Sequence, residues 1–386
     1  MSGAGLPPPD PEALAHSQAL VRLIAEHIRA SGGWISFADY MHLALYAPGL
    51  GYYSAGARKF GAQGDFVTAP ELTPLFGEAL ATQVAQVLRV CGGDVLELGA
   101  GSGRLAVDVL LALERMECVP QLYHILEVSP DLRQRQRALL AEAAGHLLGR
   151  VNWLDSLPEQ ITGVVLGNEV LDAMPVHLFG VRDGQLFERG CSLDAAGQCV
   201  WQDRPLTSGV LHESALQLPL SGGDYLSEIN LAAPALVQSL SDRLVQGMIL
   251  FIDYGFPRAE YYHHDRDQGT LVCHYRHRMH DDPLRAPGLT DITAHVDFTA
   301  VADAGLAAGL SVAGYTQQAH FLVNCGLLGL LEKLTPGSMP YLKAAARVNT
   351  LLQPSEMGEL FKAMALTKGL DEPLIGFVQG DKRHTL

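Results

Sequence analysis

The sequence predicts an α/β fold in which a doubly wound parallel sheet carries helices on both faces. From residue 76 onward, apolar β-prone runs alternate with segments of helical periodicity, the pattern of successive β–α–β units. A glycine-rich turn, "GAGSG" at 99–103, stands between one such strand and the next helix. The chain has 386 residues, of which 48% are hydrophobic, so it can bury a core of this size.

The elements of this fold can be placed from periodicity and from turn residues. Two N-terminal helices are expected at 17–33 and 37–46. Further helices are expected at 76–91, 103–115, 131–145, 233–246 and 298–309, and strands at 94–98, 122–128, 151–154, 163–167, 247–255 and 310–318. Asp183-Gly184 and an Ala-Ala-Gly turn separate β-prone runs in 176–202, which predicts inserted antiparallel hairpins.

These elements divide the chain into regions with different expected roles. The loop at 47–72 is rich in glycine and aromatic residues, and long loops of this kind commonly cover binding sites. We expect a flexible arm (1–16), N-terminal helices with a lid loop (17–75), a core (76–325) with a β insertion (176–230) and a C-terminal helical region (326–386).

Composition excludes several classes of partner. A net charge of −15 disfavours nucleic acid, for which "HYRHRMH" (274–280) is the only basic candidate. No apolar run approaches the roughly 18 to 20 residues that cross a bilayer, so no membrane insertion is expected. The histidines show no established ligand spacing, and no metal is expected. Six scattered cysteines and an acidic N-terminus without leader features predict a reducing, cytoplasmic location.

The glycine-rich turn predicts a cofactor site. Gly99, Gly101 and Gly103 lack side chains that would keep a ligand from the helix N-terminus, where free N–H groups await acceptors. Glu127 ends the next strand, where an acid suits the two hydroxyls of a ribose. Two alternatives remain: a tight turn beside a solvated acid, and a nicotinamide or flavin site. The spacing here is G-x-G-x-G rather than the G-x-x-G ending of the dinucleotide motif.

A second polar group follows the buried strand at 163–167. Asn168, Glu169 and Asp172 come directly after it, and burying carboxylates is costly unless they have partners. Carboxylates can accept paired hydrogen bonds from a guanidinium group. The structural alternative is that Asn168 and Asp172 cap the turn while Glu169 pairs with an arginine. Asp253 and Tyr254, at the end of the strand at 247–255, are further candidates for the same crevice.

Longer stretches resemble a known family. The E-x-G-x-G-x-G spacing from Glu97 to Gly103 resembles motif I of class I S-adenosylmethionine-dependent methyltransferases. Within that class, "GYYSAGARKFGAQGDFVTAPELTPLFGEALA", "GNEVLDAMPVHLF" and "LFIDYGFPRAEYY" resemble the MidA-like methyltransferases, over about residues 17–380. The resemblance implies a Rossmann-like class I methyltransferase core that uses S-adenosyl-L-methionine, with N-terminal and inserted elements forming a lid. The mitochondrial member of this family is a complex I assembly factor that dimethylates an arginine of a complex I subunit.

The resemblance also implies roles for individual residues. Those expected at the donor are Glu97, Gly99, Ala100, Gly101, Ser102, Gly103, Glu127, Trp153 and Asp155. Gly64, Asp65, Thr68, Pro70 and Glu71 of the lid loop are expected against the donor or the substrate entrance. The segment "LGNEV" further resembles the strand end of protein arginine methyltransferases at which a glutamate holds the guanidinium, which supports Glu169. Their second glutamate has no counterpart at that spacing, so the role of Asp172 stays open. The expected catalytic group is Glu169, Asn168, Asp172, Asp253 and Tyr254.

The resulting functional hypothesis is a protein arginine N-methyltransferase. Its partner would be a protein with an accessible arginine, with a respiratory complex I subunit or assembly intermediate as one candidate. Two alternatives are methylation of a small molecule and an assembly chaperone that binds S-adenosyl-L-methionine without essential catalysis. The acceptor, the degree of methylation and the oligomeric state, for which a dimer is one option, are left open.

Overall fold

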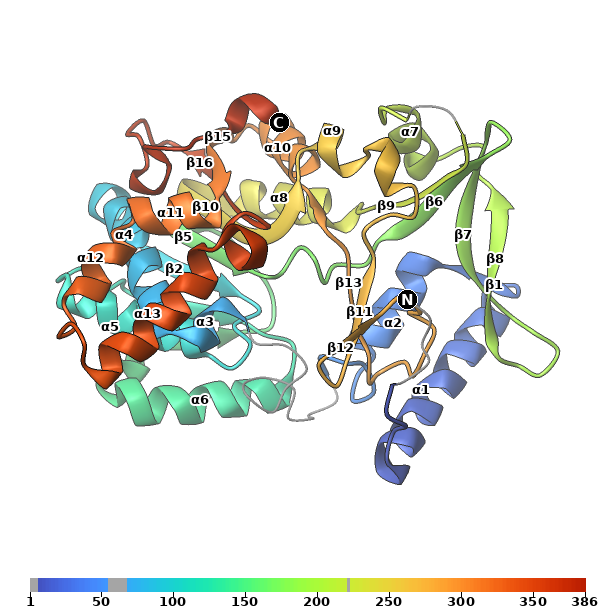
Figure 1. Cartoon of the computed structure of the whole chain (residues 1–386), viewed down its shortest axis with the longest axis horizontal. Coiled ribbons are helices and arrows are strands. Elements are labelled where there is room, and N and C mark those ends of the chain that lie inside the picture. The colour runs from blue at the N-terminus through green and yellow to red at the C-terminus, as the bar shows by residue number, and fades with distance from the viewer. Residues whose placement is uncertain (1–5, 55–67, 221–222) are drawn as a thin grey trace.

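The structure, a computed structural model, describes residues 6–54, 68–220 and 223–386. It has two halves, which lie side by side in Figure 1. One half is a large sheet between helices, and the other combines the N-terminal helices with a smaller antiparallel sheet. This arrangement confirms the α/β fold class expected from the sequence.

The central sheet is mostly parallel. Its strands in spatial order are β15 (Ser311–Gln317), β16 (Phe361–Lys368), β10 (Leu244–Phe256), β5 (Ile161–Asn168), β2 (Asp94–Leu98), β3 (Tyr123–Leu126) and β4 (Val151–Leu154), and β14 (Val296–Asp297) pairs with the end of β10. The strands from β4 to β10 are parallel, whereas β16 is antiparallel to both of its neighbours.

Strand β16 is a difference from the sequence-based expectation, which treated the C-terminal region as helical. This region contains the helices α12 (Leu327–Glu332) and α13 (Met339–Leu352), preceded by α11 (Gln318–Asn324), but the chain then enters the sheet. "FKAMALTK" lacks the two-residue alternation of a half-exposed strand and consists largely of helix-forming residues. It is nevertheless a strand because pairing with β10 and β15 buries almost all of its residues.

Helices cover both faces of the central sheet. One hydrophobic cluster joins the first face to α4 (Pro74–Cys91), α5 (Arg104–Arg115), α6 (Pro130–Ala144) and the helices α11 to α13. A second cluster joins the opposite face to α8 (Ala232–Arg243) and α10 (Phe298–Ala307). None of the helices in the described part of the chain combines the length and the apolar character needed to span a bilayer.

The second half is built from segments far apart in sequence. Its five-stranded antiparallel sheet contains β1 (Trp34–Ser36), β6 (His177–Arg182), β7 (Gln185–Leu193), β8 (Cys199–Pro205) and β9 (Tyr225–Ile229). A three-stranded sheet contains β11 (Val272–Tyr275), β12 (Arg278–His280) and β13 (Asp291–Thr293). The short helix α7 (Val210–Leu216) lies beside β9, and α9 (Arg258–Tyr261) follows β10, whereas α3 (Ala69–Leu72) packs against α4 and α5 in the other half. The strand β1 pairs with β7, so the N-terminal region and the insertion form one unit.

The N-terminal helices pack against this unit. α1 (Pro11–Ala30) begins earlier than expected, because Asp10 accepts a hydrogen bond from the Ala13 N–H and Pro11 opens the helix. α2 (Phe37–Tyr46) follows β1 directly. Apolar side chains of both helices share a buried cluster with residues of β6, β7, β11 and β13.

The position of the site follows from a reversal of strand order at β2. The following strands β3 and β4 lie on one side of β2, and β5 and β10 lie on the other. At such a reversal of strand order, the loops after the two central strands part and leave a crevice at their carboxyl ends. The glycine loop after β2 and the acidic turn after β5 therefore meet at this edge.

Replacing Leu366 of β16 with alanine tests whether this strand is a core element. Leu366 is fully buried and packs against α10 beside Gly305, so we expect a loss of about 2 to 5 kcal/mol in the free energy of unfolding. The matched control is Leu342→Ala on α13, where the side chain is half exposed and a change within about 0.5 kcal/mol is expected. Urea unfolding followed by circular dichroism measures both. Equal losses would contradict the placement of β16.

Candidate active site

A cavity of about 310 Å³ lies at the carboxyl ends of β2, β3 and β5. Residues 97–102, from the end of β2 into the glycine loop, form one wall, and the turn after β5 forms another. Much of the remaining lining comes from the N-terminal segment, with Tyr46, Tyr52, Tyr53, Thr68, Pro70 and Glu71. The strands β11 and β13 add His274, Asp291 and Thr293. The cavity thus joins the central sheet to the second half of the molecule.

The glycine loop has the backbone that its residues require. Gly101 and Gly103 have φ values of 54° and 87°, a region that favours glycine. A Cβ on Gly103 would also lie 3.1 Å from the Gln136 side chain. Gly103 is the N-cap of α5 and provides no side-chain hydrogen bond to the helix; the Arg104 N–H instead donates to Oγ of Ser102 (3.2 Å). Ser102 donates a hydrogen bond to Glu71, which ties α3 to the loop.

Glu127 is held in place by a small network. Its carboxylate accepts hydrogen bonds from the Ser129 N–H (2.9 Å) and from Nε2 of Gln136 (3.2 Å), and burial raises its pKa. Nε2 of Gln136 also donates to the carbonyl of Gly101 (2.9 Å). Oε1 of Gln136 accepts a hydrogen bond from the Trp153 indole (2.9 Å). Through Gln136, Trp153 therefore orients both Glu127 and the glycine loop.

The remaining donor candidates fall into three groups. Glu97 lines the cavity and accepts a hydrogen bond from the Tyr123 hydroxyl (2.7 Å), and burial raises its pKa to about 7. Trp153 and Asp155 do not line the cavity, and the Asp155 side chain is 90% exposed and paired with Arg133. Gly64 and Asp65 lie outside the described residues, whereas Thr68, Pro70 and Glu71 line the cavity.

The turn after β5 brings Asn168, Glu169 and Asp172 to the cavity wall. Glu169 has a φ of 53°, which is unusual for a side chain of this size, and Nδ2 of Asn168 donates to its carboxylate (3.1 Å). Burial and the charge of Asp172 raise the pKa of Glu169 to about 8, and burial raises that of Asp172 to about 6. Within the described ranges neither acid forms an ion pair with a lysine or arginine, contrary to the structural alternative for Glu169.

Asp253 is placed behind this wall rather than in the lining. Its Oδ2 accepts hydrogen bonds from the N–H groups of Val170 (3.1 Å), Leu171 (2.9 Å) and Asp172 (3.2 Å). Burial, with the nearby charges of Asp172 and Glu169, raises the pKa of Asp253. Asp253 thus fixes the turn that carries the other acids, while its neighbour Tyr254 lines the cavity and donates a hydrogen bond to Asp172.

Sequence reasoning missed part of the wall opposite this turn. Asp291 on β13 lines the cavity and accepts a hydrogen bond from the Tyr53 hydroxyl (2.9 Å). The Tyr46 hydroxyl donates to the carbonyl of Ala173 (2.9 Å), at the end of the acidic turn. The polar "LTDIT" run and the tyrosines after residue 45 were visible signals, but only the folded chain brings them together.

The electrostatic character of the cavity suits cations. The described residues of its lining include several carboxylates but neither lysine nor arginine. Oδ1 of Asn168 and Oδ1 of Asp172 are buried and have no hydrogen-bond partner in the described part of the chain, so both can accept from a ligand. A sulfonium donor and a guanidinium acceptor are both cations, and the glycine loop and Glu127 add groups suited to a nucleoside.

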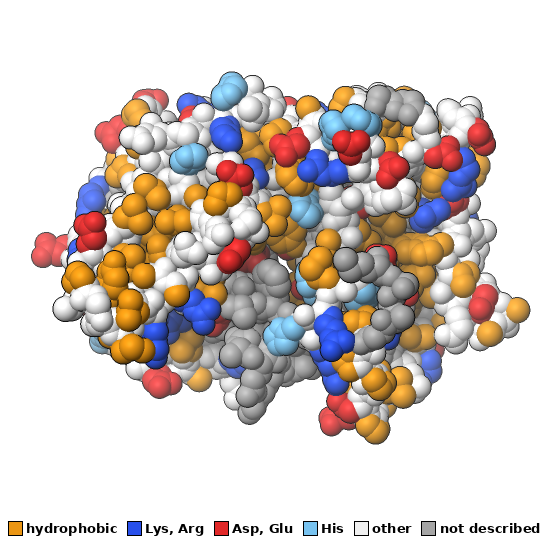
Figure 2. Space-filling model, in the orientation of Figure 1, with side chains coloured by type: hydrophobic (Ala, Val, Ile, Leu, Met, Phe, Trp, Pro, Cys, Tyr) orange, Lys and Arg blue, Asp and Glu red, His pale blue; other side chains and the backbone are white. Residues whose placement is uncertain are grey.

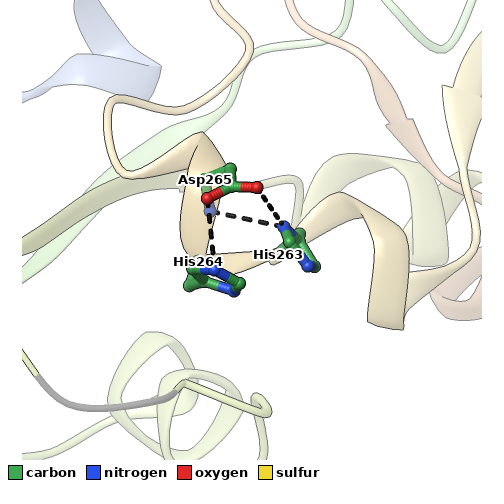
Figure 3. A group of neighbouring side chains, drawn as sticks. All are labelled: His263, His264 and Asp265. Carbon is green, nitrogen blue, oxygen red and sulfur yellow. Dashed lines mark hydrogen bonds and ion pairs between the residues drawn. The ribbon is translucent and has the colours of Figure 1, made fainter.

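A separate histidine group lies on the surface. His263, His264 and Asp265 place one potential ligand atom each within 4.8 Å of one another, and all three side chains are exposed (Figure 3). Asp265 pairs with both histidines, at 3.4 Å and 3.1 Å. None of the three lines the cavity.

Comparisons with known proteins agree with this geometry. The model of a family of S-adenosyl-L-methionine-dependent methyltransferases matches residues 79–316. The protein arginine methyltransferase NDUFAF7 homolog of Drosophila melanogaster is 30% identical, covering 96% of this chain and 92% of that protein. Human NDUFAF7, also named as a protein arginine methyltransferase, is 28% identical and covers 87% and 80%.

A solved structure extends the likeness to a bound ligand. A crystal structure of a Burkholderia thailandensis protein with S-adenosyl-homocysteine bound has a TM-score of 0.95 and 48% sequence identity, covering 99% of this chain and all of that chain. S-adenosyl-homocysteine is what remains of S-adenosyl-L-methionine after methyl transfer. The neighbour therefore agrees with the cofactor expected from the glycine loop.

One expectation is corrected by these comparisons. The predicted cytoplasmic location is contradicted, because the fly and human relatives are both named as mitochondrial proteins. The error arose because the cysteine pattern and the N-terminal composition were read as evidence of location. All three comparisons support the enzyme class, the family model and the solved structure support the cofactor, and the solved structure supports the fold. The chain belongs to the MidA-like family of S-adenosyl-L-methionine-dependent methyltransferases.

Proposed function

We propose that this enzyme methylates an arginine side chain of a protein partner. The observation that carries the proposal is the pair Glu169 and Asp172, two buried acids in the donor cavity with no cationic residue beside them in the described structure. A guanidinium group would neutralise them and could bond to both oxygens of one carboxylate. The names of the fly and human relatives support the same acceptor.

The arrangement of the residues fits the chemistry of such a transfer. S-adenosyl-L-methionine supplies the methyl group, and the protein mainly has to hold the attacking nitrogen in line with it. We assign this holding role to Glu169, which Asn168 orients, and a supporting role to Asp172 with Tyr254. Methylation of a guanidinium releases one proton, and a buried carboxylate with a raised pKa is suited to accept it.

Glu169→Gln tests the acceptor and the role of Glu169. Gln keeps the shape of the side chain but loses the charge, so we expect transfer to fall about a hundredfold while donor binding persists. The assay uses labelled S-adenosyl-L-methionine and an extract of cells that lack the gene, followed by hydrolysis and identification of methylarginine. Glu332→Gln, on the exposed part of α12, is the matched control. Label found only in small molecules would contradict the proposed acceptor.

Glu127→Gln tests the donor side of the cavity. Loss of a charged hydrogen-bond acceptor costs about 1.5 to 3 kcal/mol, so binding of S-adenosyl-homocysteine should weaken roughly ten- to a hundredfold in calorimetry. Asp155→Asn is the matched control, because the structure places that side chain in solvent, and we expect affinity within about twofold of the unaltered protein. An equal loss in both variants would return Asp155 to the donor contacts that the family resemblance implies.

The raised pKa of Glu169 predicts a pH dependence of stability. Its pKa is about 8 in the folded chain against 4.5 for the free group, so the folded state binds this proton more tightly. The stability that the proton gives is complete below pH 4.5 and is lost as the pH rises through 8. Since Gln at 169 is always neutral, Glu169→Gln should gain stability relative to the unaltered protein as the pH rises from 5 to 9. Urea unfolding at several pH values measures the difference, and a constant difference would contradict the assignment.

A further inference from the structure

The hairpin formed by β11 and β12 presents a basic tip. Arg276 and His277 form its two-residue turn, and Arg278 and Met279 follow, all of them exposed. In Figure 2, basic and histidine colours lie over this hairpin, in the middle of the molecule between its two halves. Two acidic residues, Asp281 and Asp282, follow the opposite end of β12, so the positive charge of the hairpin is found at its tip.

The residues of the tip do not match the preference of its backbone conformation. Arg276 and His277 have φ values of 48° and 61°, the combination of a type I′ turn, for which Asn-Gly is the favoured pair. Two successive residues with large side chains are strained in this conformation. A sequence chosen for the turn alone would not place Arg and His here, so the side chains themselves are a candidate for function.

The tip lies close to the wall of the cavity. His274, two residues before Arg276, lines the cavity, and its cross-strand neighbour on β13 is Asp291, which lines it as well. At about 3.4 Å per residue, two residues of strand place the tip roughly 7 Å beyond His274. Met279 is the partner of His274 on β12, so the two side chains share one face of the hairpin.

One contact shows that the tip accepts a carboxylate. NH2 of Arg276 lies 3.0 Å from the carboxylate of Asp10, the residue that caps α1. Both side chains of this pair are substantially exposed, and exposed ion pairs are weak. A carboxylate of another molecule could therefore replace Asp10 on Arg276 at little cost.

We propose that the tip of this hairpin, Arg276 to Arg278, is a docking surface for an acidic stretch of the protein acceptor. The proposal rests on the proposed arginine methyltransferase function and adds a rule for its substrate. An extended peptide advances about 3.3 Å per residue, so the acidic residues lie about two to four positions from the arginine that enters the cavity. The acidic cavity selects the arginine, and the basic tip selects its neighbours.

The test compares three peptides of equal length that carry one central arginine flanked by Asp and Glu, by Gly and Ser, or by Lys. Binding is measured by fluorescence anisotropy with S-adenosyl-homocysteine present, so that no turnover is needed. We expect the acidic peptide to bind about tenfold more tightly than the lysine peptide. Arg276→Glu with Arg278→Glu should abolish this preference, whereas Lys333→Glu with Lys343→Glu, exposed on the other half, should preserve it.

A second variant keeps the hairpin folded while removing charge. Arg276→Asn with His277→Gly introduces the preferred turn pair, so the melting temperature should hold or rise while the affinity for the acidic peptide falls. Equal binding of the three peptides to the unaltered protein, or a preference for the lysine peptide, would overturn the docking surface. If the acidic peptide binds through the tip but no arginine is ever methylated, the proposed function fails and the docking surface stands.

Discussion

The active site depends on one buried carboxylate that need not touch any ligand. Asp253, at the end of β10, accepts three consecutive backbone N–H groups from the turn after β5. The Glu169 N–H still pairs with the carbonyl of Ile252, so sheet pairing extends to the first residue of the turn, and Asp253 captures the next three. The turn is thereby fixed to a core strand, and the side chains of Glu169 and Asp172 have a defined direction into the cavity.

This anchoring permits an arrangement that would otherwise be unfavourable. Glu97, Glu127, Glu169 and Asp172 lie around one cavity, and burial raises the pKa of each. Such a group of acids is costly in the empty protein, because each charged form has lost water and meets like charges. A cationic ligand offsets both the lost hydration and the repulsion between the carboxylates. Binding of a cationic donor and a cationic acceptor is therefore favoured. The cavity selects its ligands by charge before it selects them by shape.

The sequence was most informative about the parts of the site whose residues lie close together along the chain. The glycine loop, Glu127 and the "GNEVLD" turn each lie within a few residues at a strand end, and the structure places all three at the cavity. It was least informative where distant segments meet, as for Tyr53 with Asp291 and for β1 with β7. Trp153 and Asp155 show a further limit, because a strand end can be located from sequence while the face that each side chain takes depends on register. The strand β16 was missed because its composition is that of a helix and only its neighbours impose the extended form.

The position of β16 also bears on how the chain reaches its native state. The strand lies inside the central sheet, between β10 and the edge strand β15, yet it follows both of them along the sequence. During synthesis, β10 and β15 leave the ribosome before their shared partner exists, and each exposes an unpaired edge flanked by apolar surface. The sheet can close only when β16 inserts, so until then the open edges of β10 and β15 can pair with each other or with another chain.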